Sequence, residues 1–147
     1  VRDNLKGDSG MADIELKLLI GLHRVCNEID RRSSQIFAQY GLSLGQFAVL
    51  EVLYHKGNLS VGEVQKKILS TSGTIPVIVN NLTKRGLVER LTDVDDKRKC
   101  ILHITEEGKK LMREVFPKNK TTIIDSMSNW SDEEKNQMLK ILKKFER

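Results

Sequence analysis

Apolar residues recur at helical spacing through most of the chain, and one short stripe organises the rest. Between residues 72 and 85, four apolar residues stand at positions i, i+3, i+4 and i+7: Ile75, Ile78, Val79 and Leu82. This stripe predicts a helix that begins at Ser72 or Gly73, with a side-chain hydroxyl as its cap, and ends at Arg85. Pro76 is tolerated there, because an N–H in the first turn has little helical partner to lose. The opposite face is short, polar to mildly apolar and ends in basic residues. Such a surface suits the floor of a DNA major groove better than bulk water.

A companion helix is expected immediately before this one. Ser60 and Glu63 have the spacing of a capping box, and Leu59 and Val64 stand at the two staple positions. The polar residues 70–73 supply a tight turn. A helix, a turn and an amphipathic helix in this order indicate a helix-turn-helix.

Two strands joined by a charged turn follow. Residues 87–92 and 100–104 are typical of strands, the second with partial alternation, and residues 93–99 are the charged turn between them. A helix-turn-helix followed by such a hairpin is a winged helix-turn-helix. The chain is therefore predicted to be mainly α, with a small β-hairpin wing.

Longer helices flank this module. A long apolar stripe over residues 12–40 predicts one helix ended by Gly41, and Ser43 with Gln46 forms a capping box for a helix that stops near residue 56.

After the wing, Thr105 caps a further helix, in which Pro117 is expected to cause a kink or a local break. A last helix opens at Ser131 with a third capping box. These terminal helices carry more apolar surface than one small domain needs, which indicates a partner helix.

The order of these motifs resembles the MarR family of bacterial transcriptional regulators. Three stretches carry the resemblance, which spans about residue 16 to the C-terminus: 82–90, 93–99 and 102–108. The family's Asp-Arg-Arg wing triplet reads Asp96-Lys97-Arg98 here, and Ile104 stands where the family usually has leucine before Thr105.

The resemblance implies one domain over residues 11–147. Its winged helix-turn-helix lobe would be residues 43–104, and its helical dimerisation region would come from both termini, residues 11–42 and 105–147. Residues 1–10 have no periodicity and are expected to be a cloning remnant or a segment without regular structure.

The function that the resemblance implies is sequence-specific DNA binding by a homodimer. Such a regulator is most often a repressor, relieved when a small-molecule inducer or a stress signal acts between the dimerisation helices and the winged lobe. Its double-stranded DNA partner would be a pseudo-palindromic operator, because a two-fold dimer reads two half-sites about one helical turn apart.

Ten residues are expected to contact DNA. They lie on the helix from residue 72 and on the wing: Ser72, Thr74, Pro76, Val77, Asn80, Asn81, Lys84, Lys97, Arg98 and Lys99. The wing residue Arg98 resembles the family's minor-groove arginine. Asp96 is expected to order the wing by pairing with a neighbouring basic side chain, not by contacting DNA. The alternatives are that Asn80 and Asn81 merely face water and that the wing lysines are solvated.

Composition is consistent with this interpretation. A chain of 147 residues with net charge +5 is one domain of ordinary size that favours a polyanionic partner. No run of 18 apolar residues and no signal peptide is present, so a cytoplasmic protein without a membrane partner is expected. No nucleotide-binding motif and no motif of a catalytic nucleophile is present, so we expect neither enzymatic activity nor a bound cofactor. The three histidines are dispersed along the chain, so we expect no metal site.

Two other classes of protein stay open. One is a regulator switched by oxidation of Cys26, weighed against a buried structural cysteine. The other is a winged-helix protein-interaction module that has lost DNA binding. Separately, the first-helix arginines Arg24, Arg31 and Arg32 could border an anion or phenolic ligand pocket, or simply form a solvated basic face.

Overall fold

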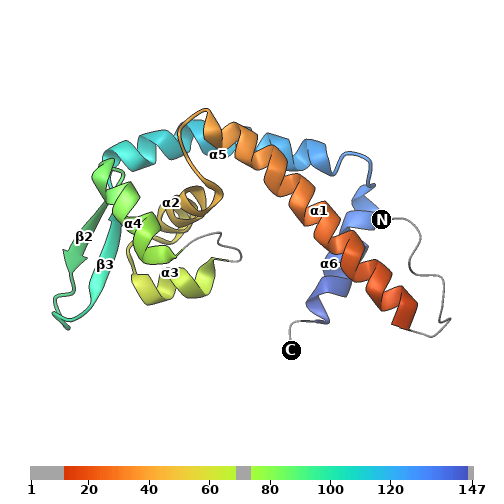
Figure 1. Ribbon diagram of the computed structural model, residues 1–147, viewed down its shortest axis with the longest axis horizontal. Coiled ribbons are helices and arrows are strands. Elements are labelled where there is room, and N and C mark those ends of the chain that lie inside the picture. The colour runs from red at the N-terminus through yellow and green to blue at the C-terminus, as the bar shows by residue number, and fades with distance from the viewer. Residues whose placement is uncertain (1–11, 69–73, 146–147) are drawn as a thin grey trace.

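The computed structural model describes residues 12–68 and 74–145 and has the shape of an arch (Figure 1). Helix α5 (Glu106–Ser126) runs across the top, and helix α1 (Ala12–Ala38) descends from the top of the arch into one of its two ends. One end of the arch is the helical limb, which consists of residues 12–27 of α1 and helix α6 (Asp132–Lys143). The other end is the winged lobe.

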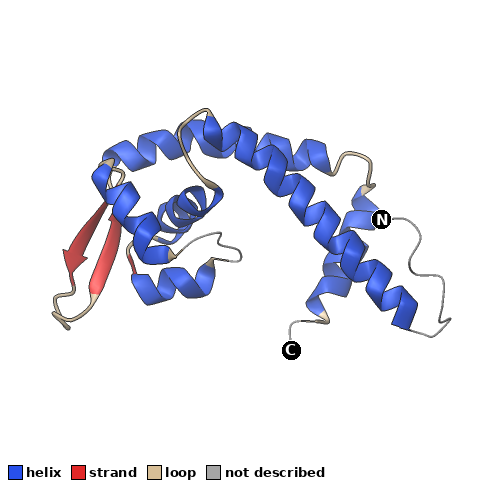
Figure 2. Ribbon diagram, in the orientation of Figure 1, coloured by secondary structure: helices blue, strands red, loops and turns tan. Residues whose placement is uncertain are grey.

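The winged lobe, residues 43–104, combines three helices with a small antiparallel sheet (Figure 2). Its elements are α2 (Leu44–Lys56), β1 (Leu59–Ser60), α3 (Val61–Lys67), α4 (Ile75–Lys84), β2 (Val88–Thr92) and β3 (Cys100–Ile104). The strand order is β1-β3-β2, and the β2–β3 hairpin is the wing. The predicted fold, mainly α with a hairpin wing, is confirmed.

Strand β1 was not predicted. Leu59 pairs with Leu102 of β3 and Ser60 pairs with Ile101, so the two residues before α3 add a third strand to the hairpin. This pairing fastens the start of the helix-turn-helix to the base of the wing.

The predicted caps of α2, α3, α5 and α6 are confirmed. Full capping boxes open α2, α3 and α6 at Ser43, Ser60 and Ser131, and the Thr105 hydroxyl of α5 accepts a hydrogen bond from the backbone N–H of Gly108. Each cap satisfies backbone donors that a helix end would otherwise leave exposed, which defines where the chain turns into helix.

The hydrophobic core lies within the winged lobe and between that lobe and helices α1 and α5. Phe37 of α1 stacks on Phe47 of α2 with ring centroids 4.1 Å apart. Around this pair lie side chains from α2, α4, β3 and α5 that are almost completely buried: Leu50, Leu53, Val79, Leu82, Leu102, Met112 and Val115. Apolar burial of this kind is the main stabilising contribution, so α4 rests on a rigid base.

The predicted start of helix α4 and the predicted local break of helix α5 at Pro117 are wrong, whereas the alternative of a kink at Pro117 stays a prediction. Helix α4 begins at Ile75, not at Ser72 or Gly73, because Thr74 has the extended N-cap conformation (φ −81°, ψ 137°) and its side chain makes no capping bond. Ser72 and Gly73 lie outside the described residues. Helix α5 continues through Pro117 without a break. Proline removes only one helical hydrogen bond, and the buried Val115 and Asn119 hold α5 in place on either side.

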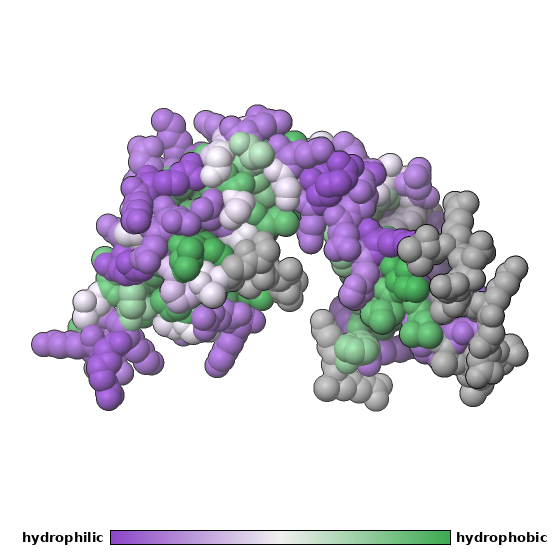
Figure 3. All heavy atoms as spheres, viewed as in Figure 1, coloured by the Kyte–Doolittle hydropathy of each residue, from purple (hydrophilic) through white to green (hydrophobic). Residues whose placement is uncertain are grey.

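The helical limb has no core of its own. Its apolar residues are exposed on α1 and α6, and Figure 3 shows apolar atoms gathered on this part of the molecule: Ile14, Leu18, Leu22, Met138, Leu139, Ile141 and Leu142. Cys26 is likewise exposed and free, so the prediction of a buried structural cysteine is wrong for the single chain. The reason is that this half of α1 projects beyond the winged lobe (Figure 1).

Candidate DNA-binding surface

Helix α4 divides into a buried and an exposed face. Ile75, Ile78, Val79 and Leu82 are buried, as their spacing predicts. The predicted DNA-contacting residues of this helix that the structure describes are all exposed: Thr74, Pro76, Val77, Asn80, Asn81 and Lys84. Val77, Asn80 or Asn81, and Lys84 follow one another at helical spacing. The exposed face therefore presents, along one line, an apolar patch at Val77, the side-chain amides of Asn80 and Asn81, and the ammonium group of Lys84 at its end.

The amide of Asn80 is held by an arginine of the wing. The Nη2 atom of Arg90, on β2, donates a hydrogen bond to Asn80 Oδ1 at 2.6 Å, and both residues are exposed. Arg90 was not among the predicted DNA-contacting residues. The signal for it was strand periodicity, because Arg90 lies two residues from the buried Val88 and so shares its face.

The wing turn is organised by aspartates. Asp96 Oδ1 accepts hydrogen bonds from the backbone N–H of Arg98 at 3.0 Å and from its Nε at 3.2 Å. Asp93 Oδ1 accepts from the backbone N–H of Asp95 at 3.0 Å, and Asp93 N donates to Lys99 O at 3.2 Å. The expectation that Asp96 orders the wing by pairing with a neighbouring basic side chain is confirmed, because its partner is Arg98.

Three adjacent cations occupy this turn. Lys97, Arg98 and Lys99 are exposed, and the Arg98 side chain is 92% accessible. Asp96 accepts a hydrogen bond from the Nε atom of Arg98. The two terminal nitrogens of Arg98 make no hydrogen bond to any described residue. These nitrogens are the bidentate donors with which arginine binds phosphates and base edges.

The C-terminal end of α4 is anchored to the turn between α1 and α2. Arg85 donates from Nη1 to Gly41 O at 2.8 Å and from Nη2 to Tyr40 O at 3.0 Å. Gly86 follows with φ +71°, a conformation that favours glycine, and its carbonyl accepts from the Thr105 hydroxyl at 2.6 Å. Arg85 therefore fixes the helix, and Lys84 is the cation that the end of α4 exposes.

A cavity of about 760 Å³ lies between α1, α2, the end of α3 and α5. Its apolar lining comes from eight residues: Ile29, Phe37, Leu44, Phe47, Ala48, Val52, Ile68 and Ile123. A volume of this order accommodates a small organic molecule. The cavity joins the winged lobe to the helices that lead to the helical limb.

One buried polar atom at this cavity has no hydrogen-bond partner among the described residues. Asn119 is 7% exposed, and its buried Oδ1 accepts no hydrogen bond from any described residue. Burial raises the pKa of Glu51, an effect partly offset by His55. Ser33 is also buried at the cavity wall. A buried acceptor without a donor is costly, so the site favours a ligand that supplies one.

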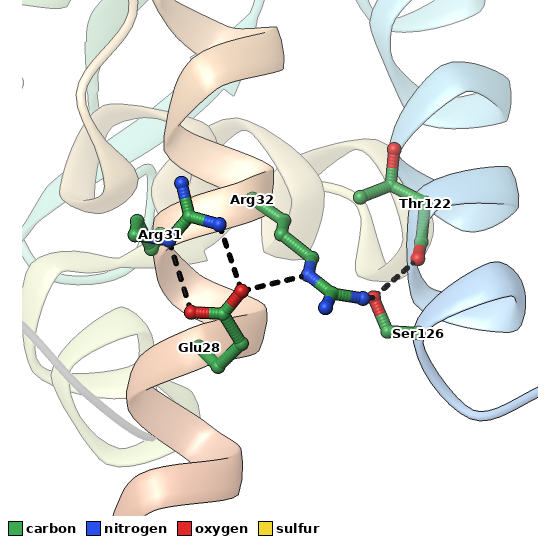
Figure 4. Close-up of polar contacts among 5 residues, drawn as sticks. All are labelled: Glu28, Arg31, Arg32, Thr122 and Ser126. Carbon is green, nitrogen blue, oxygen red and sulfur yellow. Dashed lines mark hydrogen bonds and ion pairs between the residues drawn. The ribbon is translucent and has the colours of Figure 1, made fainter. Parts of the chain in front are cut away.

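Two of the first-helix arginines are paired instead of lining this cavity. Glu28 binds Arg31 at 2.7 Å and Arg32 at 3.0 Å, and Arg32 donates from Nη1 to Ser126 Oγ of α5 at 3.1 Å (Figure 4). The hydrogen bonds from Arg31 and then Arg32 lower the pKa of Glu28 to about 2. The residues that line the cavity include neither arginine, so the basic pocket considered from the sequence does not form there.

An exposed polar helix beside a basic hairpin, on a helical core, defines a winged helix-turn-helix DNA-binding protein. Residues 31–115 match the family model "Transcriptional regulator SarA/Rot". The chain is 34% identical over 134 residues to the HTH-type transcriptional regulator MhqR of Bacillus subtilis, covering 91% of this chain and 92% of that protein. The chain belongs to the MarR family of transcriptional regulators.

Other similarities agree with this assignment. The Bacillus subtilis HTH-type transcriptional repressor YetL is 33% identical over 129 residues, covering 86% of this chain and 77% of that protein. A mutant of Escherichia coli MarR in complex with operator DNA has the same fold, with a TM-score of 0.81 and 21% identity, covering 93% of this chain and 99% of that one. Bordetella bronchiseptica BpsR, whose DNA binding is regulated by 6-hydroxynicotinic acid, also shares the fold, with a TM-score of 0.80 and 22% identity, covering 95% and 98%.

Over residues 12–68 and 74–145, no helix is both long enough and apolar enough to cross a membrane.

Proposed function

We propose that the protein is a dimeric, sequence-specific DNA-binding regulator of transcription, a repressor relieved by a small ligand. The observation that carries the proposal is the exposed polar face of α4 beside the cationic wing turn. The repressor role is supported by similarity to YetL, and the ligand by the BpsR fold relative. Acting on bacterial DNA, it works in the cytoplasm.

In this proposal α4 lies in the major groove and the wing follows the backbone into the adjacent minor groove. Thr74 and Lys84 contact phosphates, Pro76 and Val77 pack on thymine methyl groups, and Asn80 and Asn81 reach base edges. Arg98 enters the minor groove, with Lys97 and Lys99 at phosphates. Ser72 belongs to the same predicted surface but lies outside the described residues.

The second copy is proposed to cover the helical limb. Helix α6, which the structure describes in full, buries none of its residues, although four of its twelve are exposed large hydrophobics. Exposed apolar faces of this extent usually mark a protein interface. Residues 11–42 and 105–147 are thus proposed as the dimerisation region, and residues 43–104 as the DNA-binding lobe.

The ligand is proposed to bind in the cavity between α1, α2 and α5. Filling it changes the contact between the winged lobe and the helices that join the two copies. Because a dimer must place two α4 helices at a set spacing, a small movement there weakens operator binding. A ligand can do this only if it binds the non-operator conformation more tightly.

A cysteine-switched version of the same regulator stays a prediction. Cys26 is exposed on α1, so an oxidant could reach it in the single chain. Loss of operator binding after peroxide treatment, absent in Cys26→Ser, would identify this mechanism in place of ligand relief.

The proposed function is tested by selecting bound fragments from sheared genomic DNA of the source organism. A DNA-binding regulator recovers fragments that share a pseudo-palindrome with half-sites about one helical turn apart. A selection that yields no enriched sequence contradicts the proposal and favours a winged-helix protein-interaction module.

A further inference from the structure

The contact between Arg90 and Asn80 fixes the direction of an amide on the proposed groove face. A guanidinium group carries only donors, so the amide atom that faces Arg90 must be the carbonyl oxygen. The observed bond, Nη2 to Oδ1 at 2.6 Å, has this polarity. The Asn80 amino group is then turned away from Arg90, and it donates to no described residue.

Nothing else in the described structure competes for this arginine. The neighbouring acid, Glu89, lies on the other face of β2 and approaches His103 Nε2 at 3.7 Å. No carboxylate among the described residues forms an ion pair with Arg90. Its one side-chain hydrogen bond within that part of the chain is the one to Asn80.

We infer that Arg90 is a positioning residue for base recognition and that it turns the carbonyl oxygen of Asn80 toward itself, so that the Asn80 amino group is the atom presented to a base. This inference rests on the proposed DNA-binding function. An unrestrained asparagine can pair with adenine bidentately, accepting from N6 and donating to N7. Asn80 with its carbonyl engaged instead favours any base that presents an acceptor in the major groove, namely guanine N7 and O6, adenine N7 or thymine O4, and it disfavours cytosine, which presents only an amino group there.

The alternative is that the contact merely ties the strand to the helix. Asn80→Asp separates the two roles, because aspartate still accepts from Arg90 but cannot donate to a base. A tie alone predicts a uniform loss of affinity for all duplexes, through repulsion of the phosphates. The positioning role predicts, in addition, a lost preference at one base pair in each half-site.

The experiment measures affinity for a set of operator duplexes in which each base pair is replaced, in both half-sites, by the other three. Wild type, Asn80→Asp, Arg90→Leu and Arg90→Lys are compared, with Arg113→Leu, an exposed arginine of α5, as the control for lost charge. Wild type is expected to prefer an acceptor-bearing base over cytosine by roughly tenfold at one position. Asn80→Asp and Arg90→Leu remove that preference, Arg90→Lys keeps most of it, and all four variants melt close to wild type.

Two outcomes overturn different claims. A wild type that ranks the duplexes, with the same ranking in Asn80→Asp and Arg90→Leu, overturns the role of Arg90 and leaves the proposed function standing. A wild type that discriminates among no duplexes overturns the proposed function, and the role of Arg90 with it.

Discussion

The backbone oxygen of Leu87 lies where a side chain on Gly108 would have to be. A Cβ added to Gly108 would stand 2.3 Å from Leu87 O and 2.7 Å from Ile104 Cγ1. The same oxygen accepts the backbone N–H of Thr105 at 3.0 Å. The first turn of α5 is therefore packed directly onto the chain that enters the wing, and space, not backbone conformation, requires glycine.

Gly108→Ala is expected to destabilise the protein. Backbone cannot move aside as a flexible side chain can, so the overpacking should cost about 1–3 kcal/mol of unfolding free energy. Urea denaturation measures it. Gly62→Ala is the matched control, because nothing lies within 4 Å of the added Cβ in α3, and it should be neutral or slightly stabilising. Equal stability of Gly108→Ala and Gly62→Ala would contradict the packing described here.

Local signals predicted much of the fold, and long-range pairings account for what they missed. Ser43, Ser60 and Ser131 mark helix starts because a cap depends on a residue three positions away. Strand β1 escaped prediction because two residues carry no periodicity and its partner lies on β3, about forty residues later in the chain. The wing was predictable from its charged turn and flanking strands.

The same division holds for the candidate site. The exposed residues of α4 follow from helical spacing. The contact of Arg90 with Asn80 could not be predicted, because it depends on which face of β2 lies against α4. The cavity around the unpartnered Asn119 could not be predicted either, because it forms only where α1, α2 and α5 meet. Pro117 shows the converse, since its helix-breaking tendency yields to the packing of α5 on either side.

Glu51→Gln is expected to stabilise the protein at neutral pH. Burial raises the pKa of Glu51, so its ionised form opposes folding and stability falls as pH rises through that raised pKa. The substitution removes this cost above the raised pKa and gains nothing once the pH is well below the unfolded value of 4.5. Chemical denaturation at several pH values tests this, with the exposed Glu114→Gln as control. A gain from Glu51→Gln that is the same at every pH would contradict the assignment.

Ile141→Asp is expected to convert the protein into a monomer. Ile141 is 62% exposed on α6, so a charge there leaves the fold of the chain intact but is costly inside an apolar interface. Sedimentation velocity gives the mass, and circular dichroism verifies the helix content. Val94→Asp, at a wing residue that is 94% exposed, should remain dimeric. A wild type that sediments as a monomer, or an Ile141→Asp protein that stays dimeric, would rule out this interface.

A phenolic probe is expected to bind the cavity more tightly than its methyl ether. The probe 2-naphthol can donate to the unpartnered Asn119 Oδ1, whereas 2-methoxynaphthalene cannot. A net neutral hydrogen bond of about 0.5–1.5 kcal/mol corresponds to a difference of several-fold, measured by calorimetry. Asn119→Leu should abolish the difference, and its melting temperature shows whether it folds. Equal affinity of the two probes for wild type would remove Asn119 from the ligand site.

The most direct test of the central claim is affinity for the selected operator and for a scrambled duplex across a salt series, for wild type and Arg98→Ala. Phosphate neutralisation predicts a steep loss of affinity with salt, and base readout predicts a gap of at least ~10³ between the duplexes. Arg98→Ala should narrow that gap and leave the melting temperature unchanged, because its side chain is 92% accessible. If wild type binds both duplexes weakly and alike, the protein is not a sequence-specific DNA-binding regulator.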